Sequence, residues 1–278
     1  NTSTILTTTK YIPPMGLTKV RLGNMIRALF EQDIPGTANV PAFLREVSEV
    51  TTEKSPLQII EIAVNEGTVK PFVEATMTEL VQNSIDAIRE FNPSVKVINI
   101  KLEKIPAPAG LTGLLESELV LSIIDRVGMS SDAFIYVGIP FLSTKTPSEL
   151  VTGEMGSGFF NSYRESSSVL VRSSRDGVYP TSYDVPIRDE RGRVVDIEKN
   201  MKIERDTDPS ADSFTNIAIT IPTTSRLDEV TKIARVDYTA KNILGLALMP
   251  GIRYNGVDIS IPKVLGAKVG YFELYYTD

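Results

Sequence analysis

Residues 79–87, ELVQNSIDA, lie within a predicted helix that runs from about Pro71 to Phe91. The helix is expected to end there because proline disfavours helical geometry in the residue before it, and Asn92-Pro93 follows. At about 100° per residue, apolar side chains gather on one side of this helix: Met77, Val81, Ile85 and Ile88. Polar side chains gather on the opposite side: Glu79, Asn83, Asp86 and Glu90. The pattern predicts an amphipathic helix whose apolar side packs on a core.

The polar side of this helix offers a first candidate for chemistry. Glu79 and Asn83 are one helical turn apart and Asp86 follows within a further turn, so the three side chains point into the same volume. A carboxylate and a carboxamide can orient a water and ligate a hard cation through oxygen, as magnesium-dependent phosphoryl transfer requires. A stripe that continues to Glu90 is also what any half-buried helix presents to water. Taken alone, the stretch favours a solvated face over a site.

A second candidate is the predicted strand ELVLSIID, residues 118–125, which ends on Asp125 with Gly128 just beyond it. Ligands of α/β sheets commonly sit at the carboxyl ends of strands. A carboxylate there can accept a hydrogen bond from an exocyclic amine such as that of adenine. By itself, however, the stretch reads more simply as a turn, because Asp and Gly are common turn residues.

A third candidate is the glycine cluster of GEMGSGFFNSY, residues 153–163, which precedes a segment able to become helical. Glycines let the backbone approach an anion, and a helix N-terminus offers unpaired N–H groups. It is not a Walker A loop, because no Gly-Lys-Ser/Thr follows, nor a dinucleotide fingerprint, because the last glycine comes one residue early. Alone, the cluster fits a flexible loop equally well.

The remaining patterns divide the chain into three parts. Residues 1–70 are predicted to form an N-terminal helical extension and residues 71–222 a core. Residues 223–278 are predicted to form a C-terminal helix and strands that either complete the domain or start a transducer-like region. Within the core, residues 126–160 read as irregular, and residues 188–196 (RDERGRVVD) read as a charged turn. The further strands expected are residues 95–103, 167–174, 181–187 and 214–222, and in the tail two pieces around an Asn-Gly turn after a helix over 227–249.

Composition excludes several classes of function. The 278 residues contain no cysteine, histidine or tryptophan, so disulfides, Cys/His metal sites, thiol nucleophiles and Ser-His-Asp triads are ruled out. The net charge of −6 has no long run of one sign and gives no general attraction to nucleic acid or to anionic membranes.

The sequence also bears on location. No window approaches the roughly 20 apolar residues of a membrane span, and the start lacks a basic segment followed by an apolar one. We therefore expect no membrane partner and a cytoplasmic or otherwise intracellular protein, with the nucleus left open. Because residue 1 is Asn rather than Met, we expect a chain processed from, or numbered within, a longer protein.

In chain order, the acidic-amide helix, the strand that ends on Asp125, the glycine loop and the strand over 214–222 resemble the GHKL ATPase superfamily. That group includes gyrase B subunits, heat-shock chaperones, histidine kinases, MutL, type IIB topoisomerase B subunits and microrchidia ATPases. The resemblance covers about residues 71–222: ELVQNSIDA matches the motif E-L-x-x-N-S-x-D-A, and GEMGSGF matches the form G-x-x-G-x-G-F. The latter points to the chaperone, microrchidia and type IIB topoisomerase side. The resemblance implies the Bergerat fold, an α/β (α+β) two-layer sandwich with a mixed, mostly antiparallel sheet and helices on one face.

The resemblance also implies roles for individual residues. Glu79 would be the general base that activates the attacking water, and Asn83 the Mg²⁺ ligand. Asp125 would read the adenine, with Thr215 near it at the start of a central strand. Lys145, in the lid-like FLSTK, would neutralise phosphate charge. The other residues expected to line the nucleotide site are Asp86, Ala87, Gly128, Met129, Ser143, Thr144, Gly153, Gly156, Ser157, Gly158 and Phe159.

Two positions depart from the family pattern. DRVGM, residues 125–129, is one residue shorter than D-x-G-x-G and lacks its first glycine, so the turn beneath the adenine must be built differently. Phe214 stands where a glycine commonly precedes the threonine.

The function that the resemblance implies is Mg²⁺-dependent binding and slow hydrolysis of ATP, in the N-terminal ATPase domain of a larger protein. In relatives, ATP closes a lid and joins two such domains as a homodimer, while a downstream domain supplies a Lys or Arg to the terminal phosphate. We expect slow or absent turnover by this chain alone, with downstream domains or partner proteins completing the site, because phosphoryl transfer depends on that cation. Nucleic acid would be reached only through other domains. The alternative is a degenerate, non-hydrolysing module of the same fold that acts as an interaction or scaffold domain.

Overall fold

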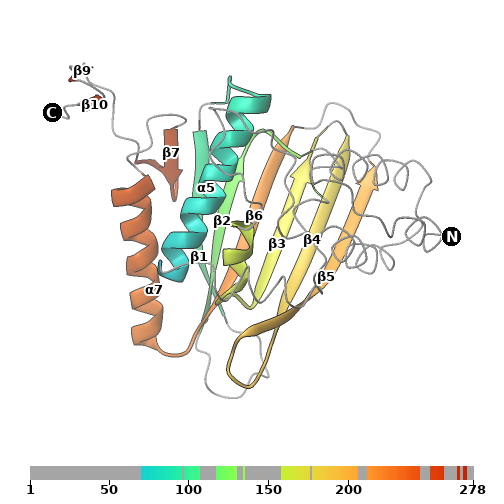
Figure 1. Cartoon of the computed structure of the whole chain (residues 1–278), viewed down its shortest axis with the longest axis vertical. Coiled ribbons are helices and arrows are strands. Elements are labelled where there is room, and N and C mark those ends of the chain that lie inside the picture. The colour runs from blue at the N-terminus through green and yellow to red at the C-terminus, as the bar shows by residue number, and fades with distance from the viewer. Residues whose placement is uncertain are drawn as a thin grey trace, which may run out of the picture.

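A mixed sheet with helices packed on it forms the described part of the molecule (Figure 1). The computed structural model describes residues 70–95, 97–106, 117–129, 134, 158–175, 177–205, 212–244 and 251–259, with the short strands 268–269 and 272–273. Within these residues, eight strands form one sheet, in the spatial order β5 (Val194–Arg205), β4 (Val178–Arg188), β3 (Ser168–Ser174), β6 (Phe214–Thr223), β2 (Ser117–Asp125), β1 (Val97–Pro106), β7 (Gly251–Tyr254) and β8 (Val257–Asp258). Neighbours in this sheet are antiparallel except for the parallel pair β1 and β7. The predicted α+β class with a mixed, mostly antiparallel sheet is confirmed. A separate antiparallel pair joins β9 (Lys268–Val269) to β10 (Phe272–Glu273).

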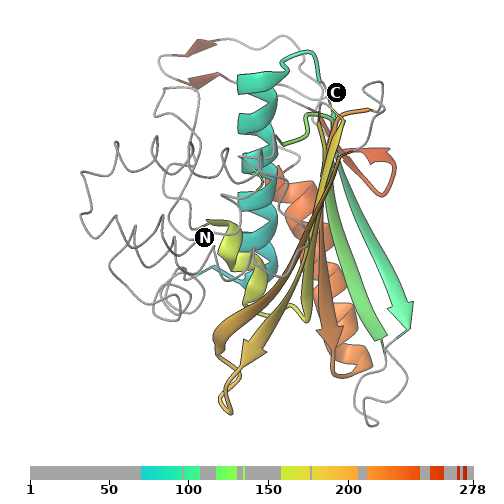
Figure 2. The same ribbon diagram turned by 90° about the vertical axis from the view of Figure 1, so that its right-hand side faces the viewer.

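Helix α5 (Phe72–Phe91) is the predicted ELVQNSIDA helix, and its bounds agree with the sequence pattern within a residue. Pro71 precedes its first turn, and Asn92 ends it with a backbone N–H that donates to Ile88 O at 3.0 Å. Figure 2 shows α5 on the same side of the sheet as the short 3₁₀-helix η3 (Gly158–Tyr163), and the two elements are in contact. The helix that ELVQNSIDA occupies is therefore a layer laid over the sheet.

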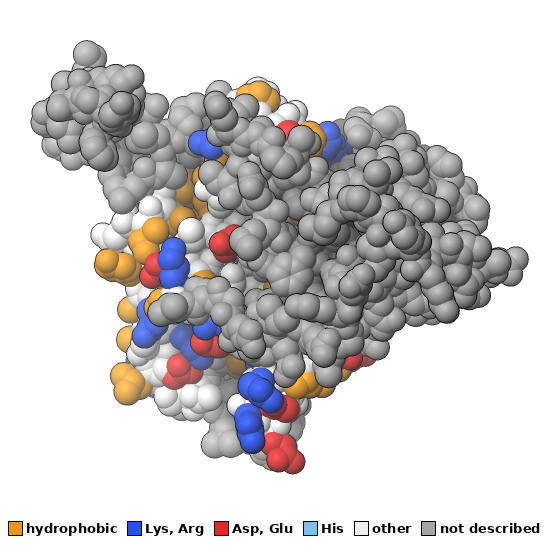
Figure 3. Space-filling model, viewed as in Figure 1, with side chains coloured by type: hydrophobic (Ala, Val, Ile, Leu, Met, Phe, Trp, Pro, Cys, Tyr) orange, Lys and Arg blue, Asp and Glu red, His pale blue; other side chains and the backbone are white. Residues whose placement is uncertain are grey.

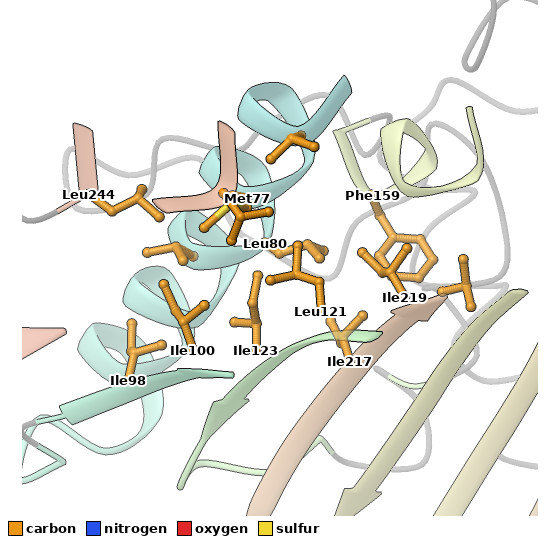
Figure 4. Packing of buried hydrophobic residues seen from close by; sticks show 14 of the residues in the cluster. Met77, Leu80, Ile98, Ile100, Leu121, Ile123, Phe159, Ile217, Ile219 and Leu244 are labelled. Atoms are coloured by element: carbon orange, nitrogen blue, oxygen red, sulfur yellow. The ribbon is translucent and has the colours of Figure 1, made fainter. Parts of the chain in front are cut away.

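The apolar core lies between α5 and the sheet. Met77 and Leu80 of α5 are completely or almost completely buried. Alternate residues of β2 and β6 pair across the strands, so that Leu121 lies opposite Ile219 and Ile123 opposite Ile217. Figure 4 shows these side chains reaching toward one another from the helix and the strands. The inward-facing residues of the strands, which repeat every two positions, thus pack against the apolar face of the helix, which repeats every 3.6.

Helix α7 (Arg226–Tyr238) packs beside α5 and is tied to the sheet by a polar network. Its N-cap is Ser225, whose hydroxyl accepts the Asp228 N–H at 3.2 Å. Glu229 of α7 accepts hydrogen bonds from Lys104 Nζ at 2.8 Å and from Ser117 Oγ at 2.6 Å. The helix predicted over 227–249 begins one residue earlier, and its α-helical part ends at Tyr238, where the chain passes into one turn of π-helix, η4 (Thr239–Ile243). Residues 245–249 of the prediction lie outside the described residues.

The prediction of a charged turn over residues 188–196 was partly wrong. The turn itself is short, and Asp189 Oδ1 accepts the backbone N–H groups of Arg191 and Arg193, each at 2.9 Å. From Val194 the chain forms β5, which pairs along β4 and was not predicted. Strand β5 is an edge strand of the described sheet, and its many charged residues hide the apolar alternation that marks a strand.

The predicted Asn-Gly turn in the tail is confirmed. Asn255 and Gly256 both have positive φ, 47° and 84°, as a two-residue hairpin turn between β7 and β8 requires. The predicted helices before residue 70 and most of the irregular segment over 126–160 lie outside the described residues. Among the helices that are described, none has the length and apolar content needed to cross a membrane.

Candidate functional site

The polar residues of α5 differ in how deeply the structure buries them. Asp86 is completely buried and accepts a hydrogen bond from Gln82 Nε2 at 2.8 Å. Glu79 and Asn83 are half-buried, whereas Glu90 is exposed. The solvated-face interpretation of this stripe therefore holds for Glu90 but not for Asp86, which is enclosed by protein.

Asp125 is joined to α5 by a buried hydrogen bond. Ser84 Oγ donates to Asp125 Oδ2 at 2.8 Å, and the backbone N–H of Val127 donates to Oδ1 at 3.0 Å. The backbone N–H of Gly128 also donates to this carboxylate. Burial raises the pKa of Asp125, and these three hydrogen bonds oppose that rise only in part. The strand end at Asp125 is thus held against the ELVQNSIDA helix.

The turn after Asp125 shows how the shortened motif is built. Gly128 has a φ of 77°, and a Cβ atom there would lie 2.2 Å from the Ser174 carbonyl oxygen, so only glycine fits. The next residue, Met129, donates its backbone N–H to Ser173 Oγ at 2.7 Å. The short turn is therefore closed against the end of β3.

A row of polar side chains crosses the sheet at this end of the apolar face. Asp125 of β2 pairs with Thr215 of β6, which pairs in turn with Ser173 of β3. Ser173 Oγ lies 3.3 Å from Thr215 Oγ1, and it also donates to the Phe214 carbonyl at 3.0 Å. All three side chains of the row are at least 95 % buried. Within this row the Asp125 carboxylate can offer an acceptor and the Thr215 hydroxyl a donor to a flat polar ligand, whereas the Ser173 hydroxyl already donates to Phe214.

The third candidate stretch meets α5 at Gly158. A Cβ atom at this position would lie 2.0 Å from Glu79 Oε2 and 2.6 Å from its carboxyl carbon. The next residue, Phe159, packs in the core, with its ring edge-to-face with that of Tyr163 at 5.7 Å between centroids. Gly158 is therefore the residue at which the end of the glycine cluster reaches the Glu79 carboxylate.

Ala87 and Met129 are both partly buried and pack against the apolar core. Six predicted site residues lie outside the described residues: Ser143, Thr144, Lys145, Gly153, Gly156 and Ser157.

Sequence reasoning missed Ser84 and Ser173. Ser84 lies inside the ELVQNSIDA motif, but the helical wheel gives no reason to pair it with Asp125. Ser173 continues the alternation of Val169 and Val171 toward the core, so a polar residue at the next inward position was the available signal.

The donors on α5 suit a cation held jointly by protein and ligand. In the part of the chain that the structure describes, no cluster of three or more acidic side chains could hold a metal alone. Asn83 supplies an amide oxygen, one helical turn from the Glu79 carboxylate. Mg²⁺ commonly takes few protein ligands and fills its remaining positions with phosphate oxygens and water, so this donor set fits Mg²⁺ brought by a nucleotide. On the face shown in Figure 3, acidic and basic side chains of the described residues are interspersed rather than segregated by sign.

No protein-family profile matches the sequence, and no curated protein matches it significantly. The likeness to the GHKL superfamily accordingly rests on the quoted motifs, and the contacts among them are the structural observations that bear on function.

Proposed function

We propose that the chain is a Mg²⁺-dependent domain that binds ATP and hydrolyses it slowly. In this proposal it has the Bergerat fold, with the helices on one face of the sheet, and nucleotide binding drives a conformational or dimerisation switch. The observation that carries the proposal is the meeting of the three candidate stretches at α5. Gly158 lies against the Glu79 carboxylate, while Asp125 is hydrogen-bonded to the same helix through Ser84.

At the phosphate end, Glu79 would accept a proton from the attacking water. Its half-buried carboxylate lies directly against Gly158, where even a Cβ atom would clash, so the backbone at the end of the glycine cluster comes close to the reacting group. Asn83 would hold Mg²⁺, which when bound with the nucleotide neutralises charge on the phosphates. In the superfamily that the chain resembles, a downstream domain supplies a Lys or Arg to the terminal phosphate, so turnover by the isolated chain should be slow.

At the base end, Asp125 would accept a hydrogen bond from the exocyclic amine of adenine. A carboxylate has about four acceptor positions. Three hydrogen bonds already reach Asp125, from Ser84, Val127 and Gly128, so capacity for one more remains. The Thr215 hydroxyl, next in the polar row, would provide the partner for a ring nitrogen, because the Ser173 hydroxyl already donates to the Phe214 carbonyl and accepts from Met129.

Calorimetric titration with a non-hydrolysable ATP analogue, with and without Mg²⁺, tests the binding step. We expect Mg²⁺-dependent binding that Asp125→Asn abolishes, because the amide presents a donor where the amine of adenine needs an acceptor. Absence of binding at millimolar analogue would overturn the proposal for the isolated chain.

The hydrolytic step is tested by phosphate release from ATP. Glu79→Ala should keep analogue binding but lose any turnover that the natural chain shows, because the general base is removed. Glu90→Ala is the matched control, since Glu90 is an exposed carboxylate on the same helix. Measurable turnover in the natural chain that is equal in the Glu79 variant would rule out the role assigned to Glu79.

A specific observation favours the second candidate, a non-hydrolysing interaction module. The turn after Asp125 folds its own N–H groups back onto the carboxylate, which occupies part of the acceptor capacity that adenine would use. Under this alternative the natural chain and Asp125→Asn give the same heat in the titration, and the domain has the same stability with and without Mg-ATP.

A further inference from the structure

The C-terminal end of η3 is fastened to β4 by buried polar contacts that sequence reasoning did not predict. Tyr163, the last residue of η3, is completely buried, and its hydroxyl donates to Asp184 Oδ2 at 2.5 Å. Ser182 donates to the other oxygen of Asp184. Burial and the neighbouring Asp184 raise the pKa of Tyr163, so the phenol stays protonated and remains a donor.

Arg188, further along the same strand, holds the segment that follows. Its Nη1 donates to the carbonyl oxygens of Arg164 at 2.8 Å and Gly192 at 3.0 Å. Its Nη2 donates to the carbonyl oxygens of Tyr163 at 2.9 Å and Ser166 at 3.0 Å. One guanidinium therefore organises four backbone carbonyls, three of them in the turn that leaves η3. The rigid, planar fork of arginine suits this task better than the single ammonium of lysine.

Residues Tyr163, Ser182, Asp184 and Arg188 are named here the β4 anchor. Ser182, Asp184 and Arg188 are an even number of residues apart on β4 and therefore share one face of that strand. The anchor lies at one end of η3, and Gly158 lies at the other. A 3₁₀-helix of six residues is only about 12 Å long, so a shift at one end is carried to the other. The fit at Gly158 has little slack, because a single added carbon would lie 2.0 Å from Glu79 Oε2.

We propose that the β4 anchor is a positioning device that holds the end of the glycine cluster at the Glu79 carboxylate, and thereby sets affinity for the phosphates of the nucleotide. The inference rests on the function proposed above and extends it to residues that touch neither nucleotide nor metal. Arg188 is the principal positioning residue, because it reaches the most backbone groups.

The test compares a ligand with phosphates to one without. The natural chain, Arg188→Ala, Arg188→Lys and Tyr163→Phe are titrated with the ATP analogue plus Mg²⁺ and, separately, with adenosine. For Arg188→Ala we expect the analogue to bind about tenfold more weakly or worse, as for a lost set of charge-assisted hydrogen bonds, while adenosine affinity is unchanged. Arg188→Lys should recover part of the loss, and Tyr163→Phe should show a smaller loss than Arg188→Ala.

Arg193→Ala is the matched control, because Arg193 lies in the same hairpin but is half exposed and pairs with Asp189. It should bind both ligands as the natural chain does. If Arg188→Ala does not fold, as judged by circular dichroism, Arg188→Lys and Tyr163→Phe carry the comparison. Unchanged analogue affinity in folded anchor variants, or an equal loss for adenosine, would overturn the inference while the proposed function stands. A natural chain that binds neither ligand would instead overturn the proposed function and the inference with it.

Discussion

At Gly158, one added methyl group should impair nucleotide binding while leaving the fold intact. In Gly158→Ala the new Cβ would lie 2.0 Å from Glu79 Oε2. The clash falls on the end of a flexible side chain, so the Glu79 carboxylate should move while the fold persists. We expect a loss of analogue affinity and of any turnover. The free energy of unfolding should fall by only about 1 kcal/mol or less, because the change is at a half-buried position with a flexible neighbour.

Gly256→Ala provides the control for replacing a glycine as such. A Cβ atom at Gly256 meets nothing within 4 Å, but its φ of 84° strains any other residue. The variant should be destabilised by about 1 kcal/mol and should bind nucleotide normally. Normal nucleotide binding by Gly158→Ala as well would contradict the role given to the contact with Glu79.

Asp125 should make stability depend on pH. Because burial raises its pKa in the folded state, the unfolded chain releases this proton at lower pH than the folded chain does. Between those two pKa values the folded state binds more protons, so stability falls as the pH rises through the window. We expect Asp125→Asn to gain stability relative to the natural chain as the pH rises from about 4, by about 1.4 kcal/mol per unit between the two pKa values.

Urea unfolding of both chains between about pH 4 and pH 7 measures this difference. Ser84→Ala supplies a second variant, because it removes the hydroxyl that donates to Asp125 Oδ2. Losing that donor raises the pKa of Asp125 further, so the stability of Ser84→Ala should fall with pH at the same slope but over a wider pH range than that of the natural chain. A stability difference between Asp125→Asn and the natural chain that stays constant across the range would show that Asp125 carries no such penalty.

The packing of β2 beneath α5 should dominate the stability of the sheet. Leu121 of β2 is completely buried in the core, whereas Leu227 of α7 is 77 % exposed. Leu121→Ala should therefore cost about 2–5 kcal/mol in the free energy of unfolding, because it leaves a cavity. Leu227→Ala should change it by about 0.5 kcal/mol at most, since the leucine buries little and alanine is a good helix former.

Guanidinium unfolding measures the free energy of unfolding of both variants. Because both are Leu→Ala changes, the comparison isolates the effect of burial. Similar costs at both sites would mean that the layer of α5 over β2 is not the principal core.

Elements differ in how much of them a local pattern reveals. Helix α5 was predicted almost to the residue, because its apolar and polar faces repeat every turn and a proline marks its end. Strand β6 alternates cleanly and was also predicted. Strand β5 was missed, because its charged residues at the sheet edge carry no apolar signal and its pairing with β4 supplies what holds it in place.

For the molecule as a whole, nucleotide binding should appear as added stability. A ligand that binds only the folded state at a hundred times its Kd adds about 2.7 kcal/mol. For a chain of this size that corresponds to a rise in Tm of roughly 5–10 °C. We expect Mg-ATP to produce this rise in a thermal unfolding experiment with the natural chain.

Asp125→Asn with Mg-ATP and the natural chain with Mg²⁺ alone are the controls for that experiment. Neither should show the rise, because the first lacks the proposed adenine acceptor and the second lacks the nucleotide. An equal rise in the natural chain and in Asp125→Asn would place the binding elsewhere.

The amino-acid sequence determined the elements that local periodicity encodes and the residue types available for chemistry. It placed Glu79 on a helix, Asp125 at the end of a strand and Gly158 at the start of a helical segment, because each depends on residues close in sequence. The tertiary structure decided which of these meet: strand order sets Asp125 beside Thr215, and the approach of η3 to α5 sets Gly158 against Glu79. It also revealed the support from Ser173 and Arg188. Such contacts join segments far apart in the chain, and their free energy comes from burial and hydrogen bonding that no local pattern records.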